Sequence, residues 1–134
     1  MKQVVLGRSG LQVSQIALGS GQFCTKPGLL FLPVGHGLGE TLAAQVGGVE
    51  LGPLLNERIR DGYLHGVAGL ADGPGVRPLV PPASTVEEHG YGVAPSLFAV
   101  AAADLSESLL EECFGPTALV IEYGSTAELT AALD

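Results

Sequence analysis

Short apolar runs separated by glycine and proline divide this chain into brief elements, and that division constrains its fold more than any other feature. The sequence has 20 glycines and 9 prolines among 134 residues. They gather at residues 35–39, 72–75 and 81–82. Because both residue types end or bend regular structure, no long helix or strand is expected to cross these positions. The chain is therefore expected to fold as short elements packed in layers.

Several β-prone runs predict strands. Residues 2–6 and 11–18 flank a polar stretch with two glycines, and this arrangement predicts an antiparallel hairpin. Further strands are expected at four short apolar runs: residues 29–34, 76–80, 92–102 and 118–123.

Helical spacing appears between these runs. Asn56 is a suitable N-cap, and the residues that follow repeat an apolar side chain every three or four positions: Ile59, Tyr63, Val67 and Leu70. Residues 39–46 predict a second helix, residues 104–110 a short acidic helical turn, and Ser125 caps a last helix. Strands that alternate with helices predict an α/β fold, in two or three layers around a small, mainly parallel sheet.

Charge and cysteine content exclude several classes of function. Net charge is −8 and the six basic residues are scattered, so no nucleic-acid surface is expected. Charged residues make up only 15% of the chain, a low share that favours self-association into a homo-oligomer. Two cysteines without metal-ligand spacing predict neither a disulfide framework nor a metal site. No run of eighteen apolar residues and no signal-peptide pattern occurs, so a cytoplasmic protein away from membranes is expected.

Two motifs carry the strongest chemical information. Residues 21–25 read Gly-Gln-Phe-Cys-Thr, and residues 111–116 read Glu-Glu-Cys-Phe-Gly-Pro. In this order and with their flanking residues, they resemble the nucleophile loop and the cofactor-ribose motif of the aldehyde dehydrogenase superfamily. Residues 52–56 and 94–98 are also similar, and the nearest subgroup oxidises 2-oxoglutarate semialdehyde. The resemblance covers residues 18–134 and implies part of that family's catalytic domain.

The resemblance also implies roles for individual residues. Cys24 would be the thiol nucleophile that attacks an aldehyde carbon, Glu112 would bind the nicotinamide ribose, and Phe114 would line the nicotinamide. Without the cofactor these last two become an exposed carboxylate and a core ring. Cys113 is expected to be a core residue.

Residues 1–18 are expected to form a hairpin extension, and residues 19–134 the domain similar to aldehyde dehydrogenases. The extension resembles the first hairpin of aldo-keto reductases, although no catalytic pattern of that family follows it. In aldehyde dehydrogenases the dinucleotide-binding domain, the oxyanion-hole asparagine and the general-base glutamate precede the cysteine, and this chain has about twenty residues there. The chain is thus expected to be a truncated member that binds no NAD or NADP unless a partner supplies the dinucleotide-binding domain.

A thiol can still transfer acyl groups without a cofactor, because cysteine is intrinsically nucleophilic. The sequence therefore predicts an esterase-like hydrolase that acts on small activated esters, with Cys24 as nucleophile and His36 as its base. His65 and His89 are the other candidate bases, both expected to lie on the surface. Two alternatives stay open: an NAD(P)-dependent aldehyde dehydrogenase completed by a partner chain, and a non-catalytic remnant that self-associates.

Overall fold

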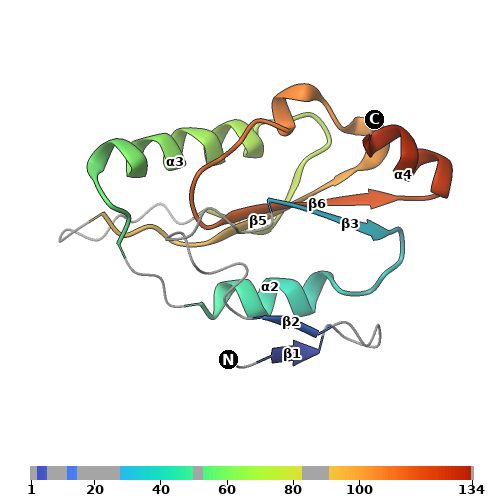
Figure 1. Ribbon diagram of the computed structural model, residues 1–134, viewed down its shortest axis with the longest axis horizontal. Helices are drawn as coiled ribbons and strands as arrows, with labels where there is room; N and C mark the ends of the chain where they lie inside the picture. Colours follow the sequence, from blue (N-terminus) through green and yellow to red (C-terminus); the bar gives the residue numbers. More distant parts are fainter. Residues whose placement is uncertain (1–2, 6–11, 15–27, 50–52, 83–90, 134) are drawn as a thin grey trace.

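The computed structural model of the chain describes residues 3–5, 12–14, 28–49, 53–82 and 91–133. A four-stranded sheet forms the centre of the molecule (Figure 1). Its strands follow the order β3 (Leu29–Pro33), β6 (Thr117–Tyr123), β5 (Ser96–Ala101) and β4 (Arg77–Val80). The first three strands in this order are parallel, and β4 is antiparallel to β5. The expected small, mainly parallel sheet is confirmed.

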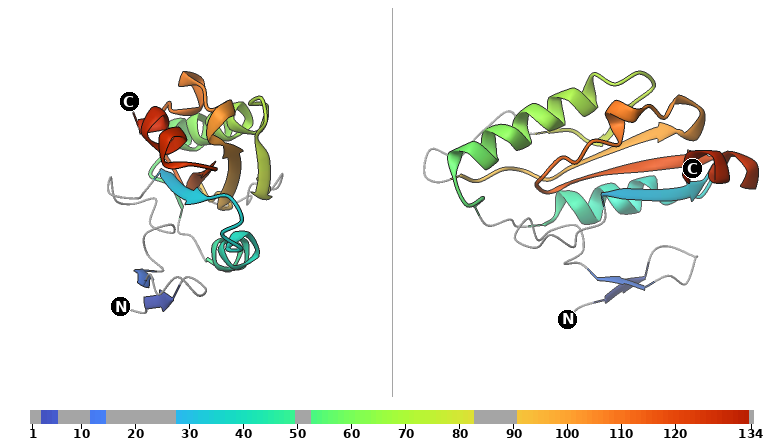
Figure 2. Two further views of the ribbon diagram at one scale, coloured as in Figure 1. Left: turned by 90° about the vertical axis from the view of Figure 1, so that its right-hand side faces the viewer. Right: turned by 45° about the horizontal axis from the view of Figure 1, so that its top comes forward.

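Helices cover both faces of this sheet, which gives three layers (Figure 2). Helix α2 (Gly39–Gly47) lies on one face, and helix α3 (Glu57–Ala71) lies on the other. Two short 3-10 turns, η1 (Ala102–Asp104) and η2 (Glu107–Leu109), follow β5 on the α3 side, and helix α4 (Thr126–Leu133) follows β6. Asn56 caps α3 as predicted, because its Oδ1 accepts from the Ile59 N–H at 3.0 Å.

The two central strands explain why the molecule has two cores. Residues alternate between the faces of a strand, so β5 sends Leu97 and Ala99 toward α2, and Phe98 and Val100 toward α3. Strand β6 divides its side chains in the same way, and both strands are therefore almost continuously apolar. On the α3 side the helix contributes the predicted stripe, of which Tyr63 is only 2% exposed.

The predicted hairpin is confirmed, because β1 (Gln3–Val5) pairs with β2 (Gln12–Ser14) in antiparallel register. One strand boundary was wrong: residues 92–95 were expected within β5, which begins only at Ser96. The carbonyl of Ala94 accepts a hydrogen bond from the Tyr63 hydroxyl at 2.8 Å, and Pro95 has no N–H to donate to a neighbouring strand. None of the helices in the described ranges combines the length and apolar character needed to cross a bilayer.

Candidate functional site

A pocket of about 240 Å³ lies on the α3 side of the sheet, where β3 and β6 begin. Gly28 and Leu29 line one side of it, and residues 109–115, which connect η2 to β6, line the other. Leu119 of β6 also lines the pocket, and its N–H donates to the Gly28 carbonyl at 2.9 Å, which joins the start of β3 to β6. The pocket therefore lies between the start of β3 and the second sequence motif.

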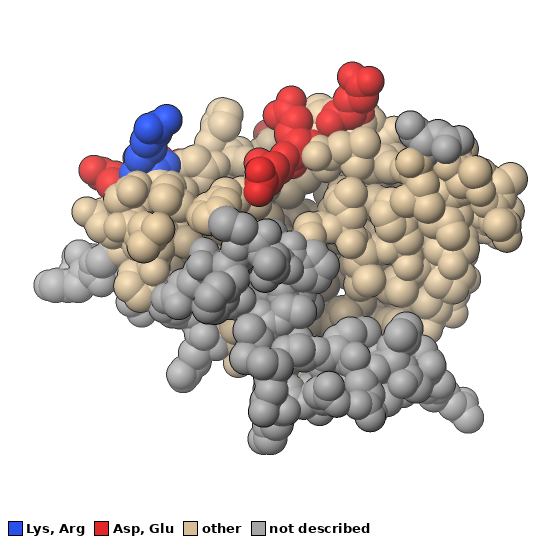
Figure 3. All heavy atoms as spheres, in the orientation of Figure 1, with Lys and Arg blue, Asp and Glu red and all other residues tan. Residues whose placement is uncertain are grey.

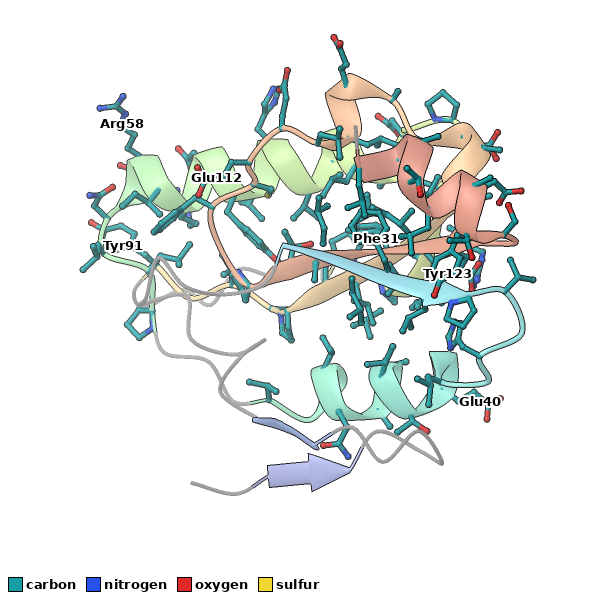
Figure 4. All side chains as sticks on the ribbon, turned by 45° about the vertical axis from the view of Figure 1, so that its right-hand side comes forward. Phe31, Glu40, Arg58, Tyr91, Glu112 and Tyr123 are labelled. Carbon is teal, nitrogen blue, oxygen red and sulfur yellow. The ribbon has the colours of Figure 1, made fainter. Side chains whose placement is uncertain are left out.

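The second motif is held at its ends and exposed in its middle. Leu109, just before the motif, is 3% exposed and anchors that end. At the other end Gly115 adopts φ 145°, a backbone angle that residues with a side chain rarely adopt. Between them Glu112 is exposed and Phe114 retains 40% of its accessible surface. Both residues also line a second, open hollow of about 330 Å³ beside the first half of α3. Glu112 and Phe114 thus line both hollows, and Figure 4 shows Glu112 beside α3.

Cys113, between these two residues, turns toward α3 instead. Its Sγ donates to the Tyr63 carbonyl at 3.8 Å, and a Cβ on Gly66 would lie 2.7 Å from the same sulfur. The absence of a side chain at Gly66 makes room for this thiol. Cys113 is half-buried against the α3-side core, in agreement with the core role expected for it.

A buried polar network around the Tyr63 hydroxyl contacts the end of the second motif. The Tyr63 hydroxyl lies 2.8 Å from the Ala94 carbonyl, 3.1 Å from Ser96 Oγ and 3.4 Å from the Pro116 carbonyl. Ser96 Oγ in turn donates to Thr117 Oγ1 at 2.9 Å. Burial raises the pKa of the Tyr63 phenol to about 12. The hydroxyl thus stays protonated, and keeps its hydrogen to donate, across the physiological pH range.

The electrostatic character of the pocket mouth is acidic. Its lining includes Glu111 and Glu112 and no lysine or arginine among the described residues. In Figure 3 acidic side chains gather above the connection from β5 to β6, whereas the visible basic side chains lie near the start of α3. Within the described ranges no group of three or more histidine, cysteine or acidic residues is placed to hold a metal ion.

His36 lies at the opposite end of β3, after the strand has finished. Its Nδ1 accepts from the Leu38 N–H at 2.8 Å, so Nε2 carries the hydrogen and faces Glu122 Oε1 at 3.2 Å. Arg77 contacts both carboxylate oxygens of Glu122, at 2.8 Å and 2.7 Å. The Arg77 guanidinium, with a smaller contribution from His36, lowers the pKa of the Glu122 carboxyl. Figure 4 shows the neighbouring Tyr123 at this far end of the sheet.

The structure brings some of the predicted site residues together. Glu112 and Phe114 meet at the pocket mouth, and His36 lies at the other end of the strand. Cys24 lies outside the described residues, which resume at Gly28 in the pocket wall. The expectation of a core ring at Phe114 in the absence of cofactor was wrong, because α3 packs against Cys113 and leaves Phe114 outward.

Of the two other candidate bases, His65 is exposed on α3 as expected, and His89 lies outside the described residues. Sequence reasoning placed Tyr63 in the apolar stripe but missed its contacts with residues 94–116. The signal available was chemical, since a buried tyrosine usually finds a partner for its hydroxyl.

Comparison with known proteins identifies relatives of this arrangement. No family model matches the chain. A curated relative, alpha-ketoglutaric semialdehyde dehydrogenase 2 of Azospirillum brasilense, is 35% identical over 127 residues, which cover 91% of this chain and 24% of the relative. The chain thus spans about a quarter of that relative's length.

Solved structures share the fold. A 1-pyrroline-5-carboxylate dehydrogenase matches with a TM-score of 0.72 at 21% identity, over 90% of this chain and 25% of its own. Lactaldehyde dehydrogenase from Escherichia coli matches with a TM-score of 0.71 at 22% identity, over 90% of this chain and 28% of its own. Both matches cover the same small share of a much longer chain, so the fold described above recurs as one part of those structures.

Proposed function

Because this chain belongs to the aldehyde dehydrogenase superfamily and matches about a quarter of a member's length, we propose that it carries the nucleophile side of such a site. In this proposal the Cys24 thiol attacks an aldehyde carbon, while Glu112 and Phe114 face the nicotinamide end of NAD or NADP. The dinucleotide-binding domain would come from another chain or segment. One observation carries the proposal: the pocket joins Gly28, four residues after Cys24, to the segment with Glu112 and Phe114.

The residues at the pocket mouth fit one end of the cofactor. A carboxylate accepts hydrogen bonds from a ribose diol, and an aromatic ring packs against a flat heterocycle. Glu112 and Phe114 are exposed and adjacent, so both are available for these contacts. The described lining offers no cation for a pyrophosphate. The fit therefore extends to the nicotinamide riboside end, and the phosphates would be held elsewhere.

The chain's own residues would act before and after the oxidation. The Cys24 thiolate would add to the aldehyde carbon while the carbonyl π electrons move to oxygen. That oxyanion would reform the C=O bond as the hydride leaves, and water would then cleave the resulting thioester to a carboxylic acid and the free thiol. Bound nicotinamide would supply the acceptor for the hydride. Glu112 would orient the ribose, and Phe114 would exclude water from one side of the reacting carbon. A reducing compartment such as the cytoplasm suits this chemistry, because the nucleophile must be a thiol or thiolate.

Selective alkylation tests this proposal at the nucleophile. Cys24 is expected to react with iodoacetamide faster than a free thiol peptide at neutral pH, whereas the half-buried Cys113 reacts more slowly. Peptide mapping by mass spectrometry separates the two cysteines within one sample, so Cys113 is the internal control. Equal, slow alkylation of both residues would argue for the non-catalytic remnant.

A second candidate activity is hydrolysis of small activated esters, the esterase-like function expected from the sequence. The observation that favours it is the pocket itself, because residues of this chain line a partly open space of about 240 Å³. Thioester formation needs a thiolate and donors for the oxyanion, and hydrolysis of the thioester needs water, so no hydride acceptor is required. His36 remains the proposed base, and its ring would first have to give up its contacts with Leu38 and Glu122.

Hydrolysis of p-nitrophenyl acetate separates these possibilities. Wild type and Cys113→Ala are expected to exceed the background rate, and Cys24→Ala is expected to match it. His36→Gln should slow the reaction, while His65→Gln, on the exposed side of α3, should leave it unchanged. Equal rates in wild type and Cys24→Ala would remove the esterase function and leave the partner-completed dehydrogenase, for which NAD binding to the assembled complex is the test.

We also propose that the chain self-associates through the β3 side of the sheet. Strand β3 is an outer strand of the four, and its first residue Leu29 and the residue after it, Val34, are 39% and 66% exposed. Sedimentation over a range of concentrations would show this association. A Val34→Lys variant should weaken it, and a monomer at all concentrations would contradict it.

The division into residues 1–18 and 19–134 is part of the same proposal. A variant that begins at residue 19 should keep the sheet and the pocket, because none of the strands of the four-stranded sheet comes from residues 1–18. Circular dichroism and urea unfolding of this shortened chain would test it.

A further inference from the structure

We propose that Tyr63 is a positioning residue, which fixes the exposed Glu112 and Phe114 at the pocket mouth through the residues that flank them. The inference rests on the function proposed above, because it assumes that Glu112 and Phe114 contact the cofactor. It goes further in naming a residue of α3, outside both sequence motifs, that acts through the cofactor-facing segment.

Glu112 and Phe114 are not held in place by contacts of their own side chains. Glu112 is exposed, and no hydrogen bond to its carboxylate is found among the described residues. Phe114 keeps 40% of its surface open to solvent. Side chains with so few contacts take many conformations unless their backbone is fixed, and ordering them on binding would cost free energy. Their arrangement must come from the neighbouring residues.

One residue of α3 contacts three of those neighbours. The Tyr63 carbonyl accepts from Cys113 Sγ at 3.8 Å, and the Tyr63 hydroxyl lies 3.4 Å from the Pro116 carbonyl. The ring lies directly against Gly115, where an added Cβ would overlap Tyr63 Cδ2 and come within 2.9 Å of Cε2. Tyr63 therefore contacts the segment on both sides of Phe114.

Tyr63 is itself held in place by burial and by a hydrogen bond. It is 2% exposed, and its hydroxyl is bonded to the Ala94 carbonyl at the entry to β5. Strand β5 is the central neighbour of β6, so the hydroxyl links the segment to the two most buried strands. A rigid support of this kind is what holds exposed binding groups in a defined geometry. Because burial raises the pKa of the phenol to about 12, this link persists at neutral and mildly alkaline pH.

Two variants test the proposal without removing the core. Tyr63→Leu would leave a cavity and unfold the protein, so the informative change is Tyr63→Phe, which keeps the ring against Gly115 and deletes only the hydroxyl. Gly66→Ala presses on Cys113 Sγ and disturbs the segment from the same helix without touching the hydroxyl. The matched control is Tyr123→Phe, a half-buried tyrosine at the other end of β6.

The first readout is backbone mobility by ¹⁵N relaxation. In the full-length wild-type chain, residues 112–114 are expected to have order parameters near 0.85, and Tyr63→Phe and Gly66→Ala should lower them toward about 0.6. The described sheet outside residues 94–96, which lose their contacts with the hydroxyl, should not change, and Tyr123→Phe should leave residues 112–114 as they are. If Tyr63→Phe lowers the urea midpoint with no selective change at residues 112–114, Tyr63 is only a core residue and the proposal is wrong.

The second readout separates this inference from the function on which it rests. Saturation-transfer NMR with nicotinamide riboside should show contact with wild type, and at least threefold weaker transfer to Tyr63→Phe. If wild type gives no transfer, the cofactor-facing role of Glu112 fails, and the relaxation result alone still decides whether Tyr63 positions the segment. Equal transfer to wild type and Tyr63→Phe would contradict the positioning role.

Discussion

Two glutamates ten residues apart show how differently the two ends of this sheet are built. Glu112, before β6, is exposed at the pocket mouth, and its carboxylate makes no hydrogen bond with the described residues. Glu122, near the end of β6, accepts two bonds from Arg77 and faces His36. One carboxylate is exposed without a hydrogen-bond partner among the described residues, and the other links Arg77 of β4 and His36, which follows β3, to β6. The two ends of β6 thus differ in how firmly neighbouring side chains hold a carboxylate.

The largest effect on stability should follow from a change beside Tyr63, just before β6, where Glu112 is exposed. Gly115→Ala places a Cβ in the Tyr63 ring at a backbone angle of φ 145°, and we expect it to destabilise the protein by about 2–4 kcal/mol. Urea unfolding measures this loss. The control is Gly69→Ala in α3, where a Cβ meets nothing within 4 Å and should stabilise by about 0.5–1 kcal/mol. Equal midpoints for the two variants would contradict the packing of Tyr63 against Gly115.

The next largest effect on stability is expected at Glu122, near the end of β6. Glu122→Gln removes the charge that Arg77 and His36 face, and should cost about 1 kcal/mol. The expected loss of stability is small because the Arg77 side chain is 54% exposed and water screens the ion pair. Urea unfolding at neutral pH gives the difference, and Glu107→Gln, an exposed carboxylate on η2, is the control. A loss as small as that of the control would mean that the pair contributes nothing measurable.

Acid should remove the difference in stability between the wild type and Glu122→Gln. The folded state lowers the pKa of Glu122 below its ordinary value near 4.5, so the carboxylate stabilises the protein above that value and loses its contribution as the pH falls through the lower one. The groups that face it are the Arg77 guanidinium and the His36 imidazole. Urea midpoints of wild type and Glu122→Gln should therefore converge below about pH 4.5. A gap that stays constant down to about pH 3 would contradict the assignment.

The smallest effect on stability is expected at Glu112. Glu112→Gln should change the free energy of unfolding by less than about 0.5 kcal/mol, since an exposed side chain away from the core contributes little. The same variant should weaken contact with nicotinamide riboside, because an amide is a poorer acceptor for a ribose diol. Urea unfolding and saturation-transfer NMR on one sample test both statements. A large loss of stability would remove the contrast with Glu122.

Much of the fold could be predicted from local pattern. The stripe from Ile59 to Leu70 and the cap at Asn56 predict α3, and the apolar runs predict all four strands of the sheet. The boundary at residue 96 could not be predicted, because it depends on the bond from Tyr63 to Ala94, 31 residues away. The prediction of Glu112 and Phe114 as cofactor-facing residues came from the motif and stays a prediction.

The sequence by itself determined the alternation of strands and helices and the kinship with aldehyde dehydrogenases, because these depend on the order and spacing of residues along the chain. Only the tertiary structure decided that His36 pairs with Glu122 at the far end of β3, and that Tyr63 supports the segment beside the pocket. Both contacts join residues more than fifty positions apart. Partners at that separation are selected by the order and register of the strands, which leave no local mark on the sequence.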